Sequence, residues 1–334
     1  MTKVGVLGAG TWGVALARML CRSGCAVTVW SALPQEVASL SQTRRHPNLP
    51  GMALPEELVF TGDMSLVCEN KDILLFAVPS VYVRATAAKA APYILAGQII
   101  VDVAKGIEPD TLFTLTQVIE DELQKAGNQT ARLVALSGPT HAEEVALDKP
   151  TTIVSASNDP AAAEWVQDVF MNTCLRVYTN PDVLGVELCG ALKNIIALAA
   201  GVSAGLGFGD NAKAAIITRG MVEIARLGKA MGCREETFYG LAGVGDLIVT
   251  ATSCHSRNNR AGTLMGQGIA PREAVAQVGM VVEGVNALPA AMALSQRYGV
   301  EMPIIQAVDA VVNHGADPAD TVMGLMQREK KPER

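Results

Sequence analysis

The stretch KVGVLGAGTWGVALARMLCRSGCAVTVW, residues 3–30, decides the fold of the N-terminal half of the chain. It opens with a short run of apolar and β-branched residues, 3–8, that turns at once into glycines. Residues 14–24 then have the composition of a helix that stops near Gly24, and residues 26–30 form a second strand-like run. Strand, glycine turn, helix and strand in this order are typical of a βαβ unit, whose connection is right-handed.

Four more strand-like runs follow, with helical sequence such as residues 111–125 between them. They occupy residues 73–78, 99–103, 132–137 and 151–155. This alternation predicts an α/β fold of the Rossmann-like, doubly wound kind, in which helices cover both faces of a parallel sheet.

The residue pattern of the sequence changes after Asn180. Strand-like runs cease there, and Ala- and Leu-rich helical patterns continue from Val183 to the end. The dipeptide Asn180-Pro181 is typical of a turn between two such regions. We therefore expect an α/β domain over residues 1–180 and a second, all-helical C-terminal domain over residues 181–334.

The glycine turn has the spacing GxGxxG, as GAGTWG at residues 8–13. In this pattern Gly8 permits the tight turn, Gly10 lets the backbone approach a pyrophosphate, and Gly13 lets the helix pack close to the strand. The helix N-terminus supplies amides and a partial positive charge to the phosphates. The pattern predicts a dinucleotide-binding domain; the alternative is a glycine-rich turn that binds no ligand.

The choice between NAD and NADP is normally made at the end of the second strand, by an acidic residue or an arginine. Here the residues are Trp30, Ser31, Ala32 and Leu33, which carry neither signature. Ser31 can hydrogen-bond either nucleotide. Arg44 or Arg45, in the next loop, is a candidate for the extra phosphate of NADP, and a solvated surface pair is the alternative. The preference stays open at this stage.

A lysine interrupts an apolar helical segment, ELCGALKNIIALAAG, residues 187–201. At helical spacing Lys193 shares a face with Gly190, Ala197 and Ala200, which leave room for a ligand. A buried ammonium needs an anionic partner or has its pKa lowered toward neutrality, where it exchanges protons. A salt-bridged structural lysine is the alternative. Asn194 fits helix packing and ligand contact equally well.

Two turns carry residues suited to anions. In LSGPTHAEEVA, residues 136–146, Thr140 and Glu143 have the spacing of a capping box, which predicts Thr140 as an N-cap beside the amides near Gly138. Lys105 follows another predicted strand, at the sheet edge where ligands of open α/β sheets bind.

The second turn lies in residues 240–262, where glycines precede Asp246 and a polar run begins at Ser256. Arg257, flanked by Ser256 and Asn258, suits a phosphate, because a guanidinium offers a rigid fork of donors. A solvated loop is the alternative for this run.

Composition and charge exclude several function classes. With 33 Asp and Glu against 27 Lys and Arg, the chain has a net charge of −6 and lacks a basic field for nucleic acid or an anionic membrane. The seven cysteines form neither a CxxC pair nor a disulfide framework, so we expect a cytoplasmic protein with reduced thiols. We expect no metal site, no signal peptide and no integral membrane segment, since the longest weakly polar stretch, residues 195–208, is short.

Eight blocks occur in an order that resembles one family along essentially the whole chain. They are GAGTWGVALA, FAVPS, AKGIE, SGPTHAEEV, ELCGALKNIIALAAG, GLAGVGDL, SRNNRAG and VVEGV. The sequence is similar to the NAD(P)-dependent sn-glycerol-3-phosphate dehydrogenases of the bacterial type. The resemblance implies reversible hydride transfer between NAD or NADP and dihydroxyacetone phosphate, giving the glycerol phosphate backbone for phospholipid synthesis.

The resemblance also implies roles for single residues. The family's proton-transfer lysine falls on Lys193. Its substrate contacts fall on Lys105, Gly138, Thr140, Lys193, Asp246, Ser256, Arg257 and Asn258. Together with Gly8, Gly10 and Gly13 of the turn and Ser31, its cofactor contacts fall on Thr11, Trp12, Lys105, Ala142, Arg257, Val281 and Glu283. The chain departs from the family where many members carry Arg or His after the second strand, which weakens the case for a strong NADP preference.

Two other functions fit parts of the pattern. A related two-domain dehydrogenase of a non-phosphorylated β-hydroxy acid or an opine would share the glycine turn and a buried lysine. A non-catalytic nucleotide-binding sensor would keep the fold alone. We expect a small phosphorylated substrate as the partner, and the assembly state, with a homodimer as one candidate, stays open.

Overall fold

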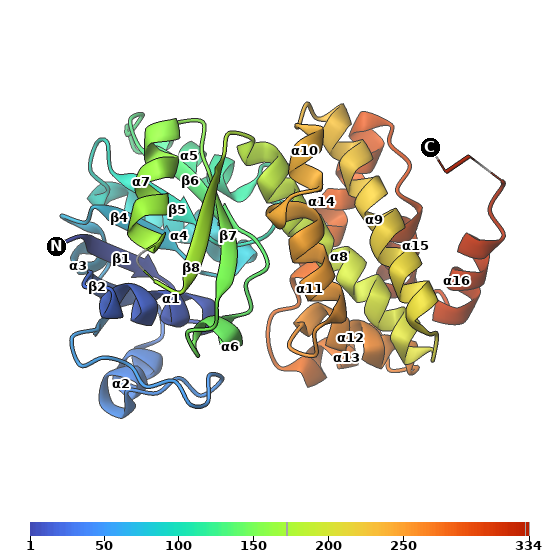
Figure 1. Ribbon diagram of the computed structural model, residues 1–334, viewed down its shortest axis with the longest axis horizontal. Coiled ribbons are helices and arrows are strands. Elements are labelled where there is room, and N and C mark those ends of the chain that lie inside the picture. Colours follow the sequence, from blue (N-terminus) through green and yellow to red (C-terminus); the bar gives the residue numbers. More distant parts are fainter. Residues whose placement is uncertain (172, 331, 334) are drawn as a thin grey trace. The chain divides into compact units, whose positions relative to one another are not determined.

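The computed structural model describes all residues except 172, 331 and 334 (Figure 1). It divides into two compact units, Met1–Glu187 and Leu188–Arg334. The two units join within a single helix, α8 (Val183–Gly205). The boundary expected from the sequence, at residues 180 and 181, lies just before that helix.

The first unit is built on an eight-stranded sheet with the order β3-β2-β1-β4-β5-β6-β7-β8. The strands are β1 (Lys3–Leu7), β2 (Ala26–Trp30), β3 (Val59–Thr61), β4 (Ile73–Phe76), β5 (Ile99–Asp102), β6 (Arg132–Ser137), β7 (Thr151–Ala156) and β8 (Leu175–Asn180). The chain winds in one direction from β1 to β3 and in the other from β4 onward. This arrangement is the doubly wound fold that the sequence predicted.

The expectation of a fully parallel sheet was wrong at one place, because β7 pairs antiparallel with β6. The connection between them holds only one short helix, α6 (Ala142–Val145), and an antiparallel neighbour needs no long crossover. The sequence analysis also missed β3 and β8. Both lie at the edges of the sheet; β3 has three residues, and β8 alternates between buried and exposed residues at its start.

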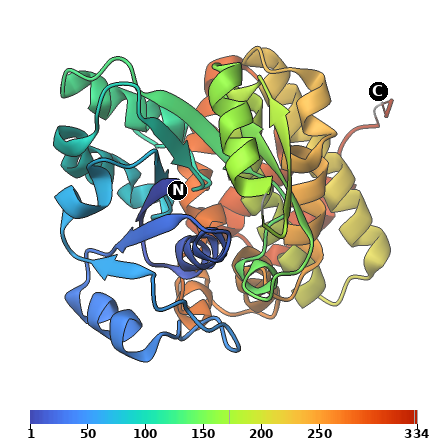
Figure 2. The same ribbon diagram turned by 60° about the vertical axis from the view of Figure 1, so that its left-hand side comes forward.

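Helices cover both faces of the sheet (Figures 1 and 2). They are α1 (Thr11–Arg22), α2 (Pro34–Thr43), α3 (Met64–Cys68), α4 (Val83–Ala90), α5 (Leu115–Lys125), α6 and α7 (Pro160–Met171), with short 3-10 turns at Ser80–Tyr82 and Ala91–Tyr93. Alternate strand residues enter opposite cores: Ile73 and Leu75 pack with α1 and α7, whereas Leu74 and Phe76 pack with α3, α4 and α5. Burial on both faces explains why these strands read as continuous apolar runs.

Helix α5 begins later than the expected 111–125. The Gln117 side chain accepts the backbone N–H of Thr114 at 3.0 Å, so Thr114 is the capping residue and the helix starts at Leu115.

The second unit is helical throughout its described residues, as the sequence predicted. It continues α8 and adds α9 (Asp210–Ala230), α10 (Glu235–Phe238), a π-helical turn (Leu241–Gly245), α11 (Asp246–Thr252), α12 (Arg257–Gly266), α13 (Pro271–Val278), α14 (Glu283–Tyr298), α15 (Pro303–His314) and α16 (Pro318–Met326). Among the helices that the structure describes, α8 is the one long and apolar enough to cross a bilayer, and it is longer than the run expected from the sequence. Since 89% of its most apolar stretch is buried inside the protein, it has the surroundings of a core helix.

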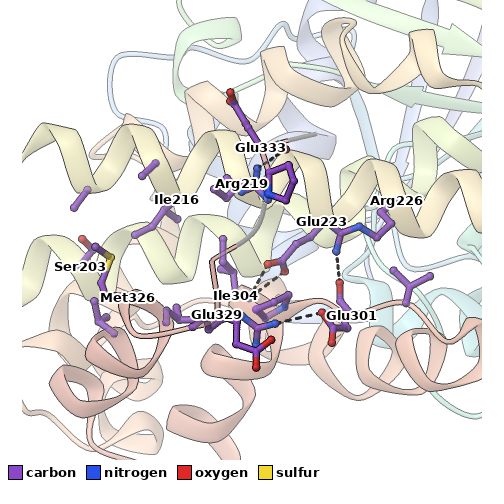
Figure 3. Close-up of a pocket in the computed structure, with 18 of the residues that line it drawn as sticks. Ser203, Ile216, Arg219, Glu223, Arg226, Glu301, Ile304, Met326, Glu329 and Glu333 are labelled. Carbon is purple, nitrogen blue, oxygen red and sulfur yellow. Dashed lines mark hydrogen bonds and ion pairs between the residues drawn. The ribbon is translucent and has the colours of Figure 1, made fainter.

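A cavity of about 770 Å³ in the second unit is bordered by α9, α15 and α16 (Figure 3). Glu223 of α9 reaches the start of α15, where its carboxylate accepts the backbone N–H groups of Ile304 and Ile305 at 2.8 to 3.3 Å. These are orphan donors of a helix N-terminus. Burial nevertheless dominates and raises the pKa of Glu223 to about 7.

This carboxyl group predicts a pH dependence of stability. The folded protein holds the Glu223 proton up to about pH 7, whereas the unfolded chain releases it near pH 4.5, where a glutamate in water has its pKa. The native state therefore binds more protons in this window, so the contribution of Glu223 to the free energy of unfolding falls as the pH rises, by at most about 1.4 kcal/mol per pH unit. In Glu223→Gln this fall should be absent.

Urea unfolding between pH 4.5 and 8 measures the effect. Glu236→Gln, at an exposed glutamate of α10, is the matched control and should keep the wild-type dependence. Equal slopes for the wild type and Glu223→Gln would contradict the assignment.

Candidate functional site

The glycine turn between β1 and α1 is an open cradle. Gly8 has φ +122°, and a Cβ there would lie 2.6 Å from the carbonyl oxygen of Ala77. A Cβ on Gly13 would lie 2.2 Å from the carbonyl oxygen of Gly8. A Cβ on Gly10, in contrast, would meet nothing within 4 Å. The fold itself requires Gly8 and Gly13, whereas Gly10 leaves space that a ligand can use.

The cradle fits the pyrophosphate of a dinucleotide. Gly10 is the N-cap of α1 and offers no capping side chain, and the first turn of this 12-residue helix carries no acidic residue. Its amides and its positive dipole end therefore suit an anion. Thr11 and Trp12 form the first turn of α1, and Trp12 also packs against the neighbouring core. The turn lies between β1 and β4, where the strand order reverses and ligands of this fold bind.

The end of β2 lies beside the cradle. The backbone N–H of Gly8 donates to the carbonyl of Trp30 at 3.0 Å, which brings Ser31 next to the turn. The Ser31 hydroxyl donates to Glu36 Oε2 at 2.5 Å and accepts the N–H of Leu33 at 3.1 Å. Glu36 was not predicted from the sequence, because it lies in the first turn of α2 and not at the end of the strand, where the acidic residue of this fold is expected.

The arginines of the next loop are placed differently. Arg44 donates to the carbonyl of Leu58 at 2.6 Å, pairs with Glu56, and has its guanidinium 5.9 Å from the centre of the Phe60 ring. Its side chain is thus held by its own loop. Arg45 is exposed.

Three predicted residues meet at the carboxyl ends of β5 and β6. Lys105 Nζ and Thr140 Oγ1 both donate to the carbonyl of Gly138, each at 3.1 Å. The expected capping role of Thr140 was wrong: α6 begins at Ala142, and its N-cap is His141, one residue later than the spacing implied. The Thr140 hydroxyl donates a hydrogen bond to the turn, at the carbonyl of Gly138, and does not cap the helix.

Two buried carboxyl groups near this edge were not predicted. Asp102, the last residue of β5, accepts the N–H of Ala104, while its Oδ2 has no hydrogen-bond partner among the described residues. Burial, reinforced by the charge of Glu187, raises the pKa of Asp102 well above its usual value. Glu187 accepts the hydroxyl of Thr114 at 2.7 Å and the N–H of Thr116 at 2.9 Å, and burial raises its pKa. Burial thus disfavours the charged form of Asp102, three residues before Lys105.

Lys193 is the centre of the second unit's polar cluster. It is 4% exposed and forms an ion pair with Asp246, which is 1% exposed. Its ammonium also donates to the hydroxyl of Thr250 at 2.6 Å, and that hydroxyl donates to the backbone carbonyl of Asp246 at 2.6 Å. The sequence predicted that a buried lysine would have either an anionic partner or a lowered pKa, and the structure shows a carboxylate partner. The partner is itself a predicted site residue.

Ser256 and Arg257 belong to a helix start and not to a solvated loop. Ser256 is the N-cap of α12 and accepts the N–H of Asn259 at 3.2 Å. Arg257, the first residue of α12, donates to the carbonyl of Val281 at 3.0 Å, two residues before Glu283 opens α14. The fork of Arg257 and the N-terminal end of a helix dipole are thus combined, which suits a phosphate.

Two asparagines tie this helix start to α8 and α14. Asn258 Nδ2 donates to Asn194 Oδ1 at 2.9 Å, and the N–H of Gly284 donates to Asn258 Oδ1 at 2.8 Å. Asn194 Nδ2 donates to the carbonyl of Gly190 on its own helix. The structure thus uses Asn194 for helix packing; a ligand contact of Asn258, through its second Nδ2 hydrogen, stays a prediction.

The arrangement supplies two kinds of chemistry. The first unit has a nucleotide cradle, and the second has a buried ammonium, paired with Asp246, of the kind that exchanges a proton with a ligand oxygen. Within the residues that the structure describes, no group of three or more His, Cys, Asp or Glu side chains is placed to hold a metal ion.

Known sequences and structures resemble the whole chain. Residues 3–163 match the family model described as NAD-dependent glycerol-3-phosphate dehydrogenase N-terminus, and residues 182–323 match the model for its C-terminus. The glycerol-3-phosphate dehydrogenase [NAD(P)+] 2 of Lactobacillus delbrueckii subsp. bulgaricus is 66% identical over 100% of this chain and 99% of its own. The corresponding Bacillus subtilis protein is 48% identical over 100% of this chain and 96% of its own.

Solved structures agree. The crystal structure of glycerol-3-phosphate dehydrogenase from Coxiella burnetii has a TM-score of 0.93 at 36% identity, over 98% of this chain and 99% of that one. The Saccharomyces cerevisiae enzyme has a TM-score of 0.81 at 26% identity, over 98% and 99% of the two chains.

The glycine cradle generates a prediction with its own control. Gly10→Ala should leave the thermal unfolding midpoint nearly unchanged, since its Cβ meets nothing within 4 Å, yet weaken dinucleotide binding. Gly13→Ala should lower the midpoint, because its Cβ collides with the Gly8 carbonyl. Differential scanning fluorimetry and titration with NADH measure the two effects. An unaltered NADH affinity in Gly10→Ala would contradict the placement of the pyrophosphate next to Gly10.

Proposed function

Because the chain belongs to the NAD-dependent glycerol-3-phosphate dehydrogenase family, we propose that it reduces dihydroxyacetone phosphate reversibly to sn-glycerol 3-phosphate with NADH or NADPH. The observation that carries this proposal is the buried Lys193–Asp246 pair, in a chain that curated dehydrogenases match from end to end. The overall reaction consumes one hydride and one proton per carbonyl group. Its product is the glycerol phosphate backbone used in phospholipid synthesis.

In this proposal most of the residues that bind the nucleotide belong to the first unit. The residues that hold it are those of the cradle, with Gly8, Gly10, Thr11, Trp12 and Gly13 at the pyrophosphate. Ser31, Lys105, Ala142, Arg257, Val281 and Glu283 are the further cofactor contacts. The bound nicotinamide supplies the hydride chemistry. The protein's own contribution is to orient the reactants and to manage charge on the substrate oxygen.

Lys193 transfers the proton. During reduction its ammonium donates a proton to the substrate C2 oxygen as negative charge develops there, and in the reverse direction the neutral amine takes that proton from the C2 hydroxyl. Asp246 stabilises the charged form of Lys193, and Thr250 orients the amine through its hydroxyl. Removing either partner therefore shifts the balance between the two forms.

The substrate phosphate is bound at the start of α12. Arg257 contributes a guanidinium, and Ser256 and Asn258 flank it in the helix's first turn. Lys105, Gly138 and Thr140 are the substrate contacts of the first unit, where Lys105 also helps to hold the reacting oxygen. A β-hydroxy acid or opine dehydrogenase and a non-catalytic sensor are not favoured, because curated relatives with full-length matches are glycerol-3-phosphate dehydrogenases.

The cellular setting is part of the same proposal. All seven cysteines are free thiols in the structure, which supports a reducing, cytoplasmic location. A homodimer is our working hypothesis for the assembly, and sedimentation velocity measures it directly.

Lys193→Met tests the proton-transfer role. Loss of a general acid should lower kcat by about 10²- to 10⁴-fold, while NADH binding persists. Because the substitution leaves Asp246 buried without its partner, the double variant Lys193→Met/Asp246→Asn should be measured beside it. Lys229→Met, at an exposed lysine of α9, is the control. Turnover near the wild-type value in the variants would exclude Lys193 from the mechanism.

Arg257→Gln tests the phosphate contact. The Michaelis constant for dihydroxyacetone phosphate should rise about 10- to 100-fold, the usual effect of losing a hydrogen bond to a charged group. At saturating NADH, the Michaelis constant for unphosphorylated dihydroxyacetone should change little. Arg260→Gln, at an exposed arginine of the same helix, should behave like the wild type. Equal Michaelis constants for wild type and Arg257→Gln would assign the phosphate to another group.

A further inference from the structure

The first turn of α2 brings an acidic side chain back to the end of β2. The strand register pairs Leu7 with Trp30, so Ser31 is level with Gly8, the first glycine of the cradle. Glu36 follows five residues later, at the third position of α2, and its carboxylate returns to the Ser31 hydroxyl. The sequence therefore lacks an acid at this strand end, whereas the folded chain has one.

Ser31 fixes the Glu36 carboxylate in place. Ser31 is 6% exposed, and its hydroxyl both accepts the N–H of Leu33 and donates to Glu36 Oε2. Glu36 is half-buried and lies at the N-terminal end of its helix, where the dipole favours a negative charge. One hydroxyl donor occupies only part of a carboxylate's acceptor capacity, so Glu36 retains room for further donors.

His46 lies near both Glu36 and the glycine turn. His46 is 6% exposed, lies near the backbone of Ala9 in the middle of the glycine turn, and accepts the N–H of Asn48 at Nδ1. Burial lowers the pKa of His46, and the nearby Glu36 opposes this shift through its charge. Glu36 is thus close to a ring that contacts the cradle itself.

We propose that Glu36 accepts hydrogen bonds from the ribose hydroxyls of the adenosine half and makes this protein select NAD over NADP. The inference rests on the proposed function for the presence of a dinucleotide in the cradle. An acidic side chain beside the first glycine of a Rossmann turn is the acceptor that a free 2′-hydroxyl needs. A 2′-phosphate at the same place would face a fixed carboxylate and be repelled.

Arg44 of the neighbouring loop does not reverse this preference. Arg44 would be the natural partner of a 2′-phosphate, but its guanidinium donates to the carbonyls of Leu58 and Pro55 and pairs with Glu56. To reach a nucleotide it would have to give up these contacts. A charged acceptor for the hydroxyl is therefore in place, and this arginine is committed elsewhere.

The test is direct binding of two probes to the full chain, without substrate. ADP-ribose and 2′-phospho-ADP-ribose are titrated by calorimetry into the wild type and into Glu36→Gln, which keeps the size of the side chain and its bond to Ser31. The wild type should bind ADP-ribose more tightly. In Glu36→Gln the affinity ratio should move about 10- to 100-fold toward the phosphorylated probe, the effect of replacing a charged acceptor by a neutral one.

Two further variants sharpen the result. Ser31→Ala keeps the charge but frees the side chain, so it should reduce the preference by less than Glu36→Gln. Glu120→Gln, at an exposed glutamate of α5, should leave both affinities unchanged. Thermal unfolding of each variant shows that the cradle is folded.

The outcomes separate this inference from the proposed function. Equal binding of both probes by the wild type, or a ratio that does not move in Glu36→Gln, overturns the role of Glu36 while the dehydrogenase activity stands. Failure of both probes to bind overturns the inference and the nucleotide cradle together. Absence of dihydroxyacetone phosphate reduction, with selective binding of ADP-ribose intact, overturns only the proposed activity.

Discussion

The buried ion pair of Lys193 and Asp246 is the interaction on which the second unit depends. Two charges that are almost fully buried lose their hydration, and an ion pair regains only part of that free energy. An apolar pair of similar size would pack into α8 at lower cost. Retention of the pair is therefore better explained by chemistry at the amine than by stability. The π-helical turn that precedes Asp246, and Thr250 one turn after it, hold the carboxylate where the amine needs it.

Most of the fold could be predicted because it follows from local patterns. The glycine turn and buried strands such as β4 and β5 have signatures within a few residues, and so does the long apolar helix around Lys193. The edge strand β3 has only three residues, and β8 is half exposed, so neither forms an apolar run. The reversed direction of β7 depends on how the chain returns to the sheet after β6, which no local pattern records.

The site was predictable as a set of residues but not as a set of contacts. Lys193 and Asp246 were both identified, yet they are 53 positions apart, and nothing in the sequence says that they pair. Glu187 and Thr114, 73 positions apart, and the return of Glu36 to Ser31 were missed for the same reason. Thr140 shows the reverse error: a local capping pattern was present, but the turn after β6 shifted the helix start by one residue.

The groups proposed to select the nucleotide lie in the first unit, and the groups proposed to transfer the proton lie in the second. In the first unit the nucleotide cradle relies on backbone amides and on glycines, and the contacts around Glu36 come from residues 9–48. In the second unit Lys193 pairs with Asp246 and donates to Thr250. Substitutions at residues that share no contact partner usually have additive effects on free energies. We therefore expect nucleotide selection to be separable from proton transfer, so that substitutions at Glu36 alter which dinucleotide binds while the ion pair of Lys193 and Asp246 stays in place.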